Sequence, residues 1–368
     1  MVKPRNIEGL PPTPGTTGEE GVTRFEKHER LHIDIGPFCN NNCIFCMEED
    51  RDGRRERVGA VTPEHVNNIL AANRFRKHVT FVSGEPTLCE HFLRYVRLAR
   101  HHGFTTIAVI SNGRRFSYLP FARAALARGL NHVILSIHGG TARLHDGLVR
   151  TRGAFDEALQ GLHNLSSLRG DNKAAVTIHT STVLNRRNCT DQALDDIVTV
   201  LSPHVDQMVF NIMQPFGRGL SHFDRLMFRY SEAAEILGRF FLRHAPRQLP
   251  IYLVDIPYCT TESCGIPGSA RGFVERYVHY EVEQDSPLST SGEAPAAEGG
   301  SPLRRQLLDQ ERSQEAAIPE LSARHRDHQE QVQKARRPAC DSCHYSEICD
   351  GVWKNYLERY GWDEFEPV

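Results

Sequence analysis

Short apolar runs alternate with longer amphipathic stretches over residues 31–213 of the chain. The runs are rich in β-branched residues, as strands buried between helices are, and they lie at residues 31–36, 78–83, 105–111, 132–138, 175–184 and 205–213. Helical periodicity occurs between them, near residues 63–73, 89–102, 118–128, 154–168 and 190–201. Thr62 and Pro63 suit a helix start, and Gly103 and Gly129 suit helix ends. The alternation predicts an α/β fold of right-handed β–α–β units around a parallel sheet.

Such a series of units forms either a doubly wound sheet or a partial barrel, and periodicity does not separate the two. In both, ligand sites lie in the loops beyond the carboxyl ends of the strands. Around a core at residues 29–222, the composition predicts four further parts. They are a flexible lead-in at 1–28, a helix and a seventh strand (223–245 and 250–257) within an extension at 223–282, a low-complexity linker with a charged helix at 283–337, and a cysteine-containing segment at 338–368.

Length and charge narrow the classes of partner. The 368 residues suggest roughly two or three domains. A net charge of −2, from 44 basic and 46 acidic residues, argues against a nucleic-acid-binding surface. The sequence has neither an apolar run long enough to cross a bilayer nor a secretory signal at its start. We therefore expect a cytoplasmic protein that uses neither nucleic acid nor a membrane as a partner.

The ten cysteines are unevenly placed, and close-set cysteines without a secretory signal indicate metal or redox chemistry rather than disulfides. Cys39, Cys43 and Cys46 directly follow the first predicted strand, so that three thiolates on one loop can converge on one centre. A structural zinc or an ordinary ferredoxin-type cluster normally takes four protein ligands. Three thiolates therefore predict an open centre that can bind a substrate or cofactor.

The C-x3-C-x2-C spacing, with Phe45 before the last cysteine, resembles the radical S-adenosylmethionine (SAM) superfamily. The resemblance extends over residues 31–219, and each of its further motifs follows a predicted strand. The motifs are Ser83-Gly84-Glu85-Pro86, with Ser in place of the family's first Gly; Ser111-Asn112-Gly113; Ser136-Ile137-His138-Gly139 with His145-Asp146; Asn185; and the segment QPFGRG at 214–219.

This resemblance implies a partial (β/α)6 TIM-like barrel with a small C-terminal iron–sulfur domain. It implies that Cys39, Cys43 and Cys46 hold a [4Fe–4S] cluster whose fourth iron binds exchangeable SAM. Further residues are then assigned to the SAM pocket: Ser83, Gly84 and Glu85 at the amino group, Ser136 and Asn185 at the ribose, and Arg150 at the carboxylate. Simpler roles are open for several of them, namely a turn carboxylate for Glu85, a space-filling residue for Ser136 and a surface ion pair for Arg150. We expect His138 and His145 to be hydrogen-bonded core or loop residues rather than metal ligands.

A second cysteine group lies near the end of the sequence. Cys340, Cys343 and Cys349 form C-x2-C-x5-C, which alone is compatible with zinc and after a radical SAM core resembles the SPASM/twitch segments that bind an auxiliary [4Fe–4S] cluster. The cysteine count supports one such cluster, with Cys259 or Cys264 as its fourth ligand. We favour Cys259 because it directly follows a predicted strand. A zinc knuckle and scattered free thiols are the alternatives, and we expect Cys89 and Cys189 to be ordinary core residues.

The resemblance implies an enzyme that cleaves SAM reductively, with a flavodoxin- or ferredoxin-type electron donor, and then abstracts a hydrogen atom from its substrate. Peptide or protein modification, as in SPASM-type maturases, is the first expectation for that substrate. A specialised metabolite such as a sugar, nucleoside or tetrapyrrole is the alternative. A non-enzymatic iron–sulfur or zinc protein, such as an electron carrier or scaffold, is the alternative from another class.

Overall fold

The structure is a computed structural model that describes residues 30–47, 51–59, 61–74, 76–170, 176–244, 249–263, 334–343, 345–346, 349 and 351–368. The predicted lead-in at 1–28, most of the linker and Cys264 lie outside the described residues.

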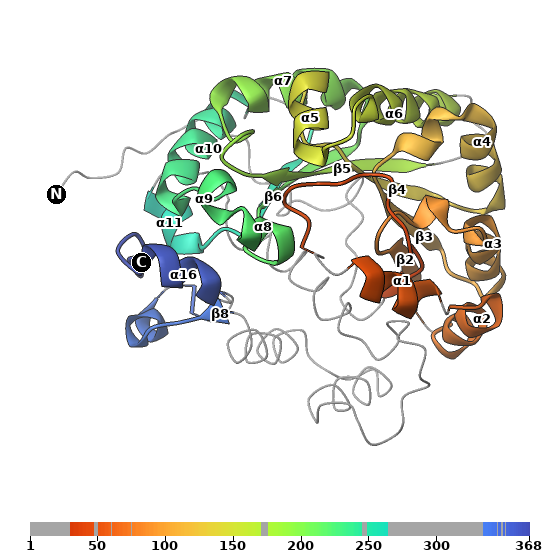
Figure 1. The fold of residues 1–368 in the computed structure, drawn as a ribbon, viewed down its shortest axis with the longest axis horizontal. Coiled ribbons are helices and arrows are strands. Elements are labelled where there is room, and N and C mark those ends of the chain that lie inside the picture. Colours follow the sequence, from red (N-terminus) through yellow and green to blue (C-terminus); the bar gives the residue numbers. More distant parts are fainter. Residues whose placement is uncertain are drawn as a thin grey trace, which may run out of the picture.

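Seven parallel strands form one sheet in the order in which they occur along the chain. They are β1 (Arg30–Asp34), β2 (His78–Val82), β3 (Thr106–Ser111), β4 (His132–Ser136), β5 (Thr177–Leu184), β6 (Gln207–Ile212) and β7 (Ile251–Val254). The strand β7 pairs with β6 and so extends the sheet past the predicted core. Figure 1 shows the sheet curving inside a layer of helices. The predicted α/β fold with a partial barrel is confirmed.

Helices cover the outer face of the sheet (Figure 1). The helices expected between the strands are present as α2 (Pro63–Ala72), α3 (Phe92–His101), α4 (Leu119–Arg128), α6 (Ala154–Gly170) and α7 (Asp191–Leu201). Five helices were not predicted, namely α1 (Arg51–Gly59), α5 (Ala142–Val149), α8 (Gly217–Ser221), α11 (Tyr258–Ser263) and α16 (Lys354–Tyr360). No helix in the described part of the chain has the length and apolar character needed to cross a membrane.

The range 223–245, predicted to be helical, contains two helices, α9 (Phe223–Leu226) and α10 (Tyr230–His244). Arg186, in the loop after β5, explains the break: its backbone N–H donates to Leu226 O at 2.7 Å and its Nε to Met227 O at 3.0 Å. Carbonyls that would have continued the helix are thus bonded to another loop.

A small C-terminal part packs against the helices that follow β6. Its strands β8 (Lys334–Ala335) and β9 (Val352–Trp353) pair antiparallel, and α16 follows β9. Tyr356 of α16 is fully buried, and its ring lies 4.6 Å from that of Tyr230 at the start of α10. The Tyr230 N–H donates to the Tyr356 hydroxyl at 3.2 Å. The C-terminal part is thereby fixed to the edge of the sheet that carries β7.

Candidate functional site

Cys39, Cys43 and Cys46 lie on the loop that leaves β1 at its carboxyl end, and all three are partly exposed. Burial, and after it charge repulsion from the neighbouring Cys39 and Cys46, raises the pKa of Cys43 to about 12. The structure therefore brings the three predicted thiols together. Three thiolates this close repel one another unless a positively charged centre binds them, which is what a metal cluster supplies.

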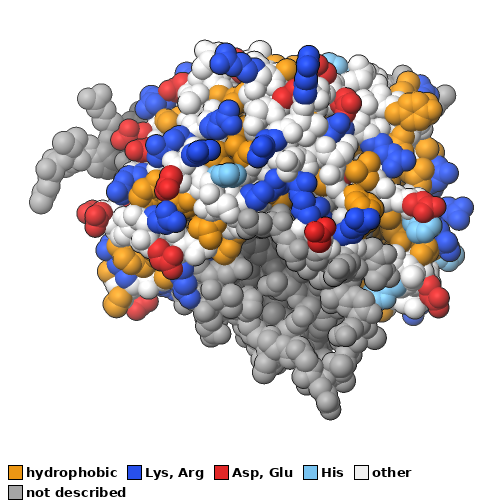
Figure 2. All heavy atoms as spheres, in the orientation of Figure 1, with side chains coloured by type: hydrophobic (Ala, Val, Ile, Leu, Met, Phe, Trp, Pro, Cys, Tyr) orange, Lys and Arg blue, Asp and Glu red, His pale blue; other side chains and the backbone are white. Residues whose placement is uncertain are grey.

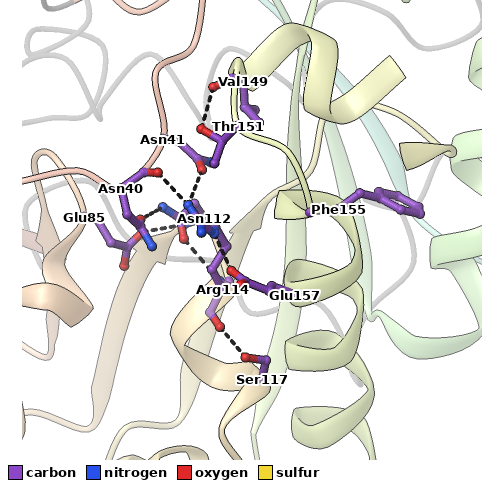
Figure 3. A network of polar contacts seen from close by, with 12 residues as sticks. Asn40, Asn41, Glu85, Asn112, Arg114, Ser117, Val149, Thr151, Phe155 and Glu157 are labelled. Atoms are coloured by element: carbon purple, nitrogen blue, oxygen red, sulfur yellow. Dashed lines mark hydrogen bonds and ion pairs between the residues drawn. The ribbon is translucent and has the colours of Figure 1, made fainter. Parts of the chain in front are cut away.

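The three asparagines between Cys39 and Cys43 fix this loop, and the first two bond to the turn after β3 (Figure 3). Asn112 donates from Nδ2 to Asn40 Oδ1 at 2.6 Å. Arg114 donates from Nη1 to Asn40 O at 2.5 Å and to Asn41 Oδ1 at 3.0 Å. The Arg114 guanidinium is itself oriented by Glu157, whose Oε2 accepts from Nε at 2.6 Å. The loop is therefore held from β3 before any ligand binds.

The third asparagine is held from the opposite side by the segment after β6. Arg218 donates from Nη1 to both the carbonyl and the side-chain oxygen of Asn42. The Arg218 backbone N–H donates to Cys46 O at 2.9 Å. A Cβ at Gly217, whose φ is +50°, would lie 2.1 Å from the Met47 carbonyl oxygen. The close approach requires glycine at this position.

Glu85 lies at the end of β2 beside the cysteine loop, with its backbone N–H donating to Phe38 O at 2.7 Å. Its side chain is only 1% exposed. Both carboxylate oxygens accept from the protein: Oε1 from Thr87 N, Thr87 Oγ1 and Ser111 Oγ at 3.1, 2.6 and 2.8 Å, and Oε2 from Asn112 N at 2.7 Å. Burial raises the pKa of this carboxyl although the four hydrogen bonds favour its charged form. The observed role of Glu85 is to join the ends of β2 and β3.

Ser83 and Gly84 form the turn that precedes Glu85, and both have positive φ, +73° and +49°. A Cβ at Gly84 would lie 2.3 Å from Gly36 O, so the two backbones are in direct contact. Ser83 departs from the family's glycine at a position whose backbone conformation favours glycine.

The other predicted SAM-pocket residues follow β4 and β5. Ser136 ends β4 and is partly exposed, and Arg150 is exposed just after α5 with φ +49°. Asn185 is fully buried: its Oδ1 accepts from Arg187 N at 3.0 Å and its Nδ2 donates to Val183 O at 3.4 Å. The structure thus gives the Asn185 side chain partners within its own turn. Its predicted contact with the ribose, like those of Ser136 and Arg150, stays a prediction.

The interpretation of His138 and His145 as hydrogen-bonded core residues is confirmed. The Nδ1 of His138 accepts from Val183 N at 3.1 Å, and the Nδ1 of His145 accepts from His138 N, also at 3.1 Å. Each neutral ring therefore carries its proton on Nε2. Burial lowers the pKa of His145 to about 4, and that of His138 also lies well below its ordinary value. The His138 ring packs edge-on against Phe45, 4.8 Å away, and so supports the cysteine loop from inside the sheet.

The second cysteine group comes together around Cys259. Burial, and after it the charges of Cys349, Cys343 and Cys340, raises the pKa of Cys259 to about 12. The four cysteines line one pocket, together with Tyr258 and Tyr345, whose rings lie 5.2 Å apart. The Gly351 N–H points at Cys349 Sγ, 3.4 Å away. Four thiols with an N–H donor to one sulfur are a suitable ligand set for an iron–sulfur cluster. Cys189 is buried in the core as expected, and Cys89 is partly exposed and packs against that core.

In the described part of the chain, no three His, Cys, Asp or Glu side chains form a group that would hold one metal ion. A [4Fe–4S] cluster makes a different demand, since each cysteine ligand binds its own iron. Of the residues that complete the first site, Asn40, Asn41, Asn42, Arg114 and Arg218 were not predicted. The signal in the sequence that could have pointed to these residues is the run of three consecutive asparagines between two cysteines.

Known proteins with similar sequences carry the same domain. Residues 33–196 match the radical SAM superfamily. The mycofactocin maturase MftC of Mycolicibacterium smegmatis is 28% identical over 189 residues, which are 51% of this chain and 45% of MftC. A GTP 3′,8-cyclase of Peptoclostridium acidaminophilum is 23% identical over 192 residues, which are 51% of this chain and 56% of the cyclase. The chain thus spans about half the length of the curated relatives it matches.

Solved structures extend the likeness of fold to most of the chain. Streptococcus suis SuiB bound to precursor peptide SuiA has a TM-score of 0.60 and 12% sequence identity, covering 92% of this chain and 75% of that chain. SuiB bound to S-adenosylmethionine has a TM-score of 0.58, also with 12% identity, over 92% of this chain and 76% of that chain. Together with the parallel sheet that carries the three-cysteine loop, the superfamily match identifies residues 33–196 as a radical SAM domain.

Proposed function

We propose that this protein is a radical SAM enzyme that modifies a peptide or protein. One observation carries the proposal above the others: a loop with three grouped thiols lies at the carboxyl ends of the strands and is clamped on both sides through its three asparagines. A loop so fixed, with three thiols rather than four, suits a cluster that leaves one iron open. An electron carrier would have no need of that open iron.

Cys39, Cys43 and Cys46 would hold a [4Fe–4S] cluster. When bound and reduced, this cluster with SAM supplies the electron that cleaves SAM to methionine and a 5′-deoxyadenosyl radical, which takes a hydrogen atom from the substrate. The backbone of Ser83 and Gly84, next to the cysteine loop, would face the SAM amino group, with Glu85 holding that backbone in place and close to the same group. Ser136 and Asn185 would lie at the ribose, and Arg150 at the carboxylate.

Cys259, Cys340, Cys343 and Cys349 would hold an auxiliary [4Fe–4S] cluster. The mutual effect of the four thiols on the pKa of Cys259 supports this set and favours Cys259 as the fourth ligand. Four cysteines are by residue type also a zinc ligand set, although in the structure these four do not group around a position for one ion, so metal analysis decides between the two.

A peptide substrate is supported by likeness to two proteins. MftC is named as a maturase, and SuiB has been solved with a precursor peptide bound. The GTP 3′,8-cyclases among the relatives act, by their name, on a nucleotide. A nucleotide or other small metabolite is therefore the alternative substrate class.

An electron donor would approach a basic face next to the cysteine loop. This face is defined by exposed arginines of α5 and the turn after it, of the loop after β5 and of α9: Arg143, Arg150, Arg152, Arg186, Arg187 and Arg225. A Cβ at Gly147 of α5 would lie 3.5 Å from Arg187, so these elements are in contact. Lys and Arg side chains gather over this part of the molecule in Figure 2. Such a face suits a flavodoxin- or ferredoxin-type donor with a negatively charged surface.

The test is SAM cleavage by the full chain, reconstituted with iron and sulfide without oxygen and then reduced. We expect 5′-deoxyadenosine from the wild type and none from C43A, whereas C89S, a change at a cysteine outside both groups, should keep the activity. Absence of 5′-deoxyadenosine from a wild type with intact clusters would contradict the proposal. Deuterium-labelled peptides and deuterium-labelled nucleotides then distinguish the two substrate classes, because the substrate transfers its deuterium to 5′-deoxyadenosine.

Iron, sulfide and zinc analysis tests the auxiliary site. C259S and C340S–C343S should each lose about one cluster's worth of iron and sulfide, while C264S should lose none. Unchanged iron together with lost zinc would refute the auxiliary cluster. Loss in C264S but not in C259S would give the fourth ligand to Cys264.

A further inference from the structure

Arg218 holds a buried guanidinium whose bonding is incomplete. Its Nη1 is bonded to Asn42, but its Nε and Nη2 are buried and have no hydrogen-bond partner among the described residues. A buried N–H without an acceptor is costly, so natural sites rarely leave two on one side chain. These two groups therefore call for an acceptor that binds at this position.

The surroundings of Arg218 point to the cysteine loop as the place of that acceptor. Its backbone N–H is bonded to Cys46 O, and its Nη1 to Asn42, which precedes Cys43. The Arg218 charge also lowers the pKa of Cys43, against the larger effect of burial. The guanidinium is thus fixed against the cysteine loop, near Cys43.

Other charges also lie near the loop. Arg54 stabilises the Cys39 thiolate, and Glu85 opposes it. Arg51 and Arg114 donate to backbone carbonyls of the loop, at Asn41 O and Asn40 O, whereas Arg218 is the arginine at this loop with two buried N–H groups that no acceptor among the described residues meets. A fixed cation beside three thiolates and the sulfides between them favours the more negative, reduced state of a cluster.

We propose that Arg218 donates from Nε and Nη2 to sulfur atoms of the cluster held by Cys39, Cys43 and Cys46, and that it thereby raises the reduction potential of this cluster. The inference rests on the proposed function, since it requires that cluster. The arginine takes no part in electron transfer: a reductant gives one electron to the [4Fe–4S]2+ cluster, and the guanidinium stabilises the 1+ state through its charge and its hydrogen bonds. Arg218 is in this sense a positioning and tuning residue.

The experiment is a reductive titration of the full reconstituted chain followed by electron paramagnetic resonance, with the N-terminal cluster identified by the change in its signal on adding SAM. In R218Q we expect reduction to be about tenfold less favourable, which is about 59 mV more negative for one electron. R218K should lie between R218Q and the wild type, because it keeps the charge and loses the fork of donors. R97Q, which removes an exposed arginine of α3, should leave the potential unchanged.

An unchanged potential in R218Q overturns the inference. If the potential is unchanged and SAM binding is weakened tenfold or more, Arg218 binds the SAM carboxylate instead of the cluster. This result also overturns the inference. If R218Q retains no cluster, the iron content of R218K decides. Iron retained in R218K supports the role of the charge. Equal loss of iron in both variants, with an intact fold by circular dichroism, would mean that Arg218 only holds the loop, and this overturns the inference. A wild type without any SAM-responsive cluster would be a failure of the proposed function, not of this inference alone.

Discussion

Single side chains set the shape of the cysteine loop. Asn40 and Asn41 bond to Asn112 and Arg114 after β3, and Asn42 bonds to Arg218 after β6, so the three residues between Cys39 and Cys43 are held from two strand ends. Short polar side chains are suited to this, because they bond to nearby groups without extending the loop. A loop fixed in this way loses little conformational entropy when its thiols bind a cluster.

Two buried histidines make the stability of the fold depend on pH. The pKa of His145 is about 4 in the folded chain, against an ordinary 6.5. Because the unfolded chain binds the proton more readily, stability is complete above pH 6.5 and is lost as the pH falls toward 4. His138 acts in the same direction. Acidification should therefore destabilise the sheet around the His138–His145 pair.

We expect H145N to be less sensitive to this acidification than the wild type. The asparagine places an acceptor where Nδ1 accepts from His138 N, and it does not titrate in this range. Between pH 7 and pH 5.5 the wild type should lose about 1 kcal/mol more of its unfolding free energy than H145N does. Urea unfolding followed by circular dichroism at the two pH values measures the difference, and equal losses would show that His145 is not the titrating group.

Whole elements show what a sequence can and cannot predict. The seven strands were found within a few residues because buried parallel strands are continuous apolar runs bounded by turns. The helix α5 was missed, because its eight residues include Arg143, Asp146 and Gly147 and only one side of it is buried. The break between α9 and α10 depends on Arg186, some forty positions earlier in the chain, and no local pattern carries that information.

The same division applies to the candidate site. The cysteines and the strand-end motifs are local patterns and were identified from the sequence. The clamps are not local: Arg218 bonds to a residue 176 positions away in the chain, and Arg114 to residues more than 70 away. Cys259 likewise joins cysteines more than 80 positions later in the chain through tertiary packing, as in the contact of Tyr258 with Tyr345. Contacts between distant segments are set by the folded topology, which periodicity does not encode.

Docking of α16 depends on a hydrogen-bonded hydroxyl, and this gives a prediction at the scale of an element. The Tyr356 hydroxyl accepts from Tyr230 N and donates to Glu364, whose side chain is only 7% exposed. In Y356F, the carboxylate and the N–H each lose a buried partner, at a cost of about 1–3 kcal/mol. We expect the segment after residue 334 to be cleaved faster in limited proteolysis, while the sheet is retained.

The matched control is Y360F, which keeps a ring that packs on Phe223 at 5.4 Å and changes a partly exposed tyrosine one turn later. Mass spectrometry of the fragments gives the cleavage rate of the C-terminal segment. Equal rates in Y356F and Y360F would mean that apolar packing alone holds α16 in place.

At the scale of the whole molecule, a net charge of −2 conceals an uneven distribution. The basic face defined above lies next to the cysteine loop, since Asn42 N is bonded to Val149 O at the end of α5. A negatively charged protein would be attracted to this face over distances of about 10 Å at moderate ionic strength. Because the attraction acts on encounter, it should affect the rate of electron delivery rather than the properties of the cluster.

Reversing two charges on this face tests the effect. In R143E–R187E we expect cluster reduction by an acidic flavodoxin to slow about tenfold at low salt, with the difference from the wild type vanishing as salt screens the charges. Reduction by photoreduced deazaflavin, a small molecule that forms no protein interface, should be unchanged. R94E–R97E, with the same reversal at exposed positions of α3, is the matched control. Stopped-flow absorbance gives the rates; equal slowing in both double variants would assign the effect to overall charge, and slowing with deazaflavin would assign it to damage at the cluster.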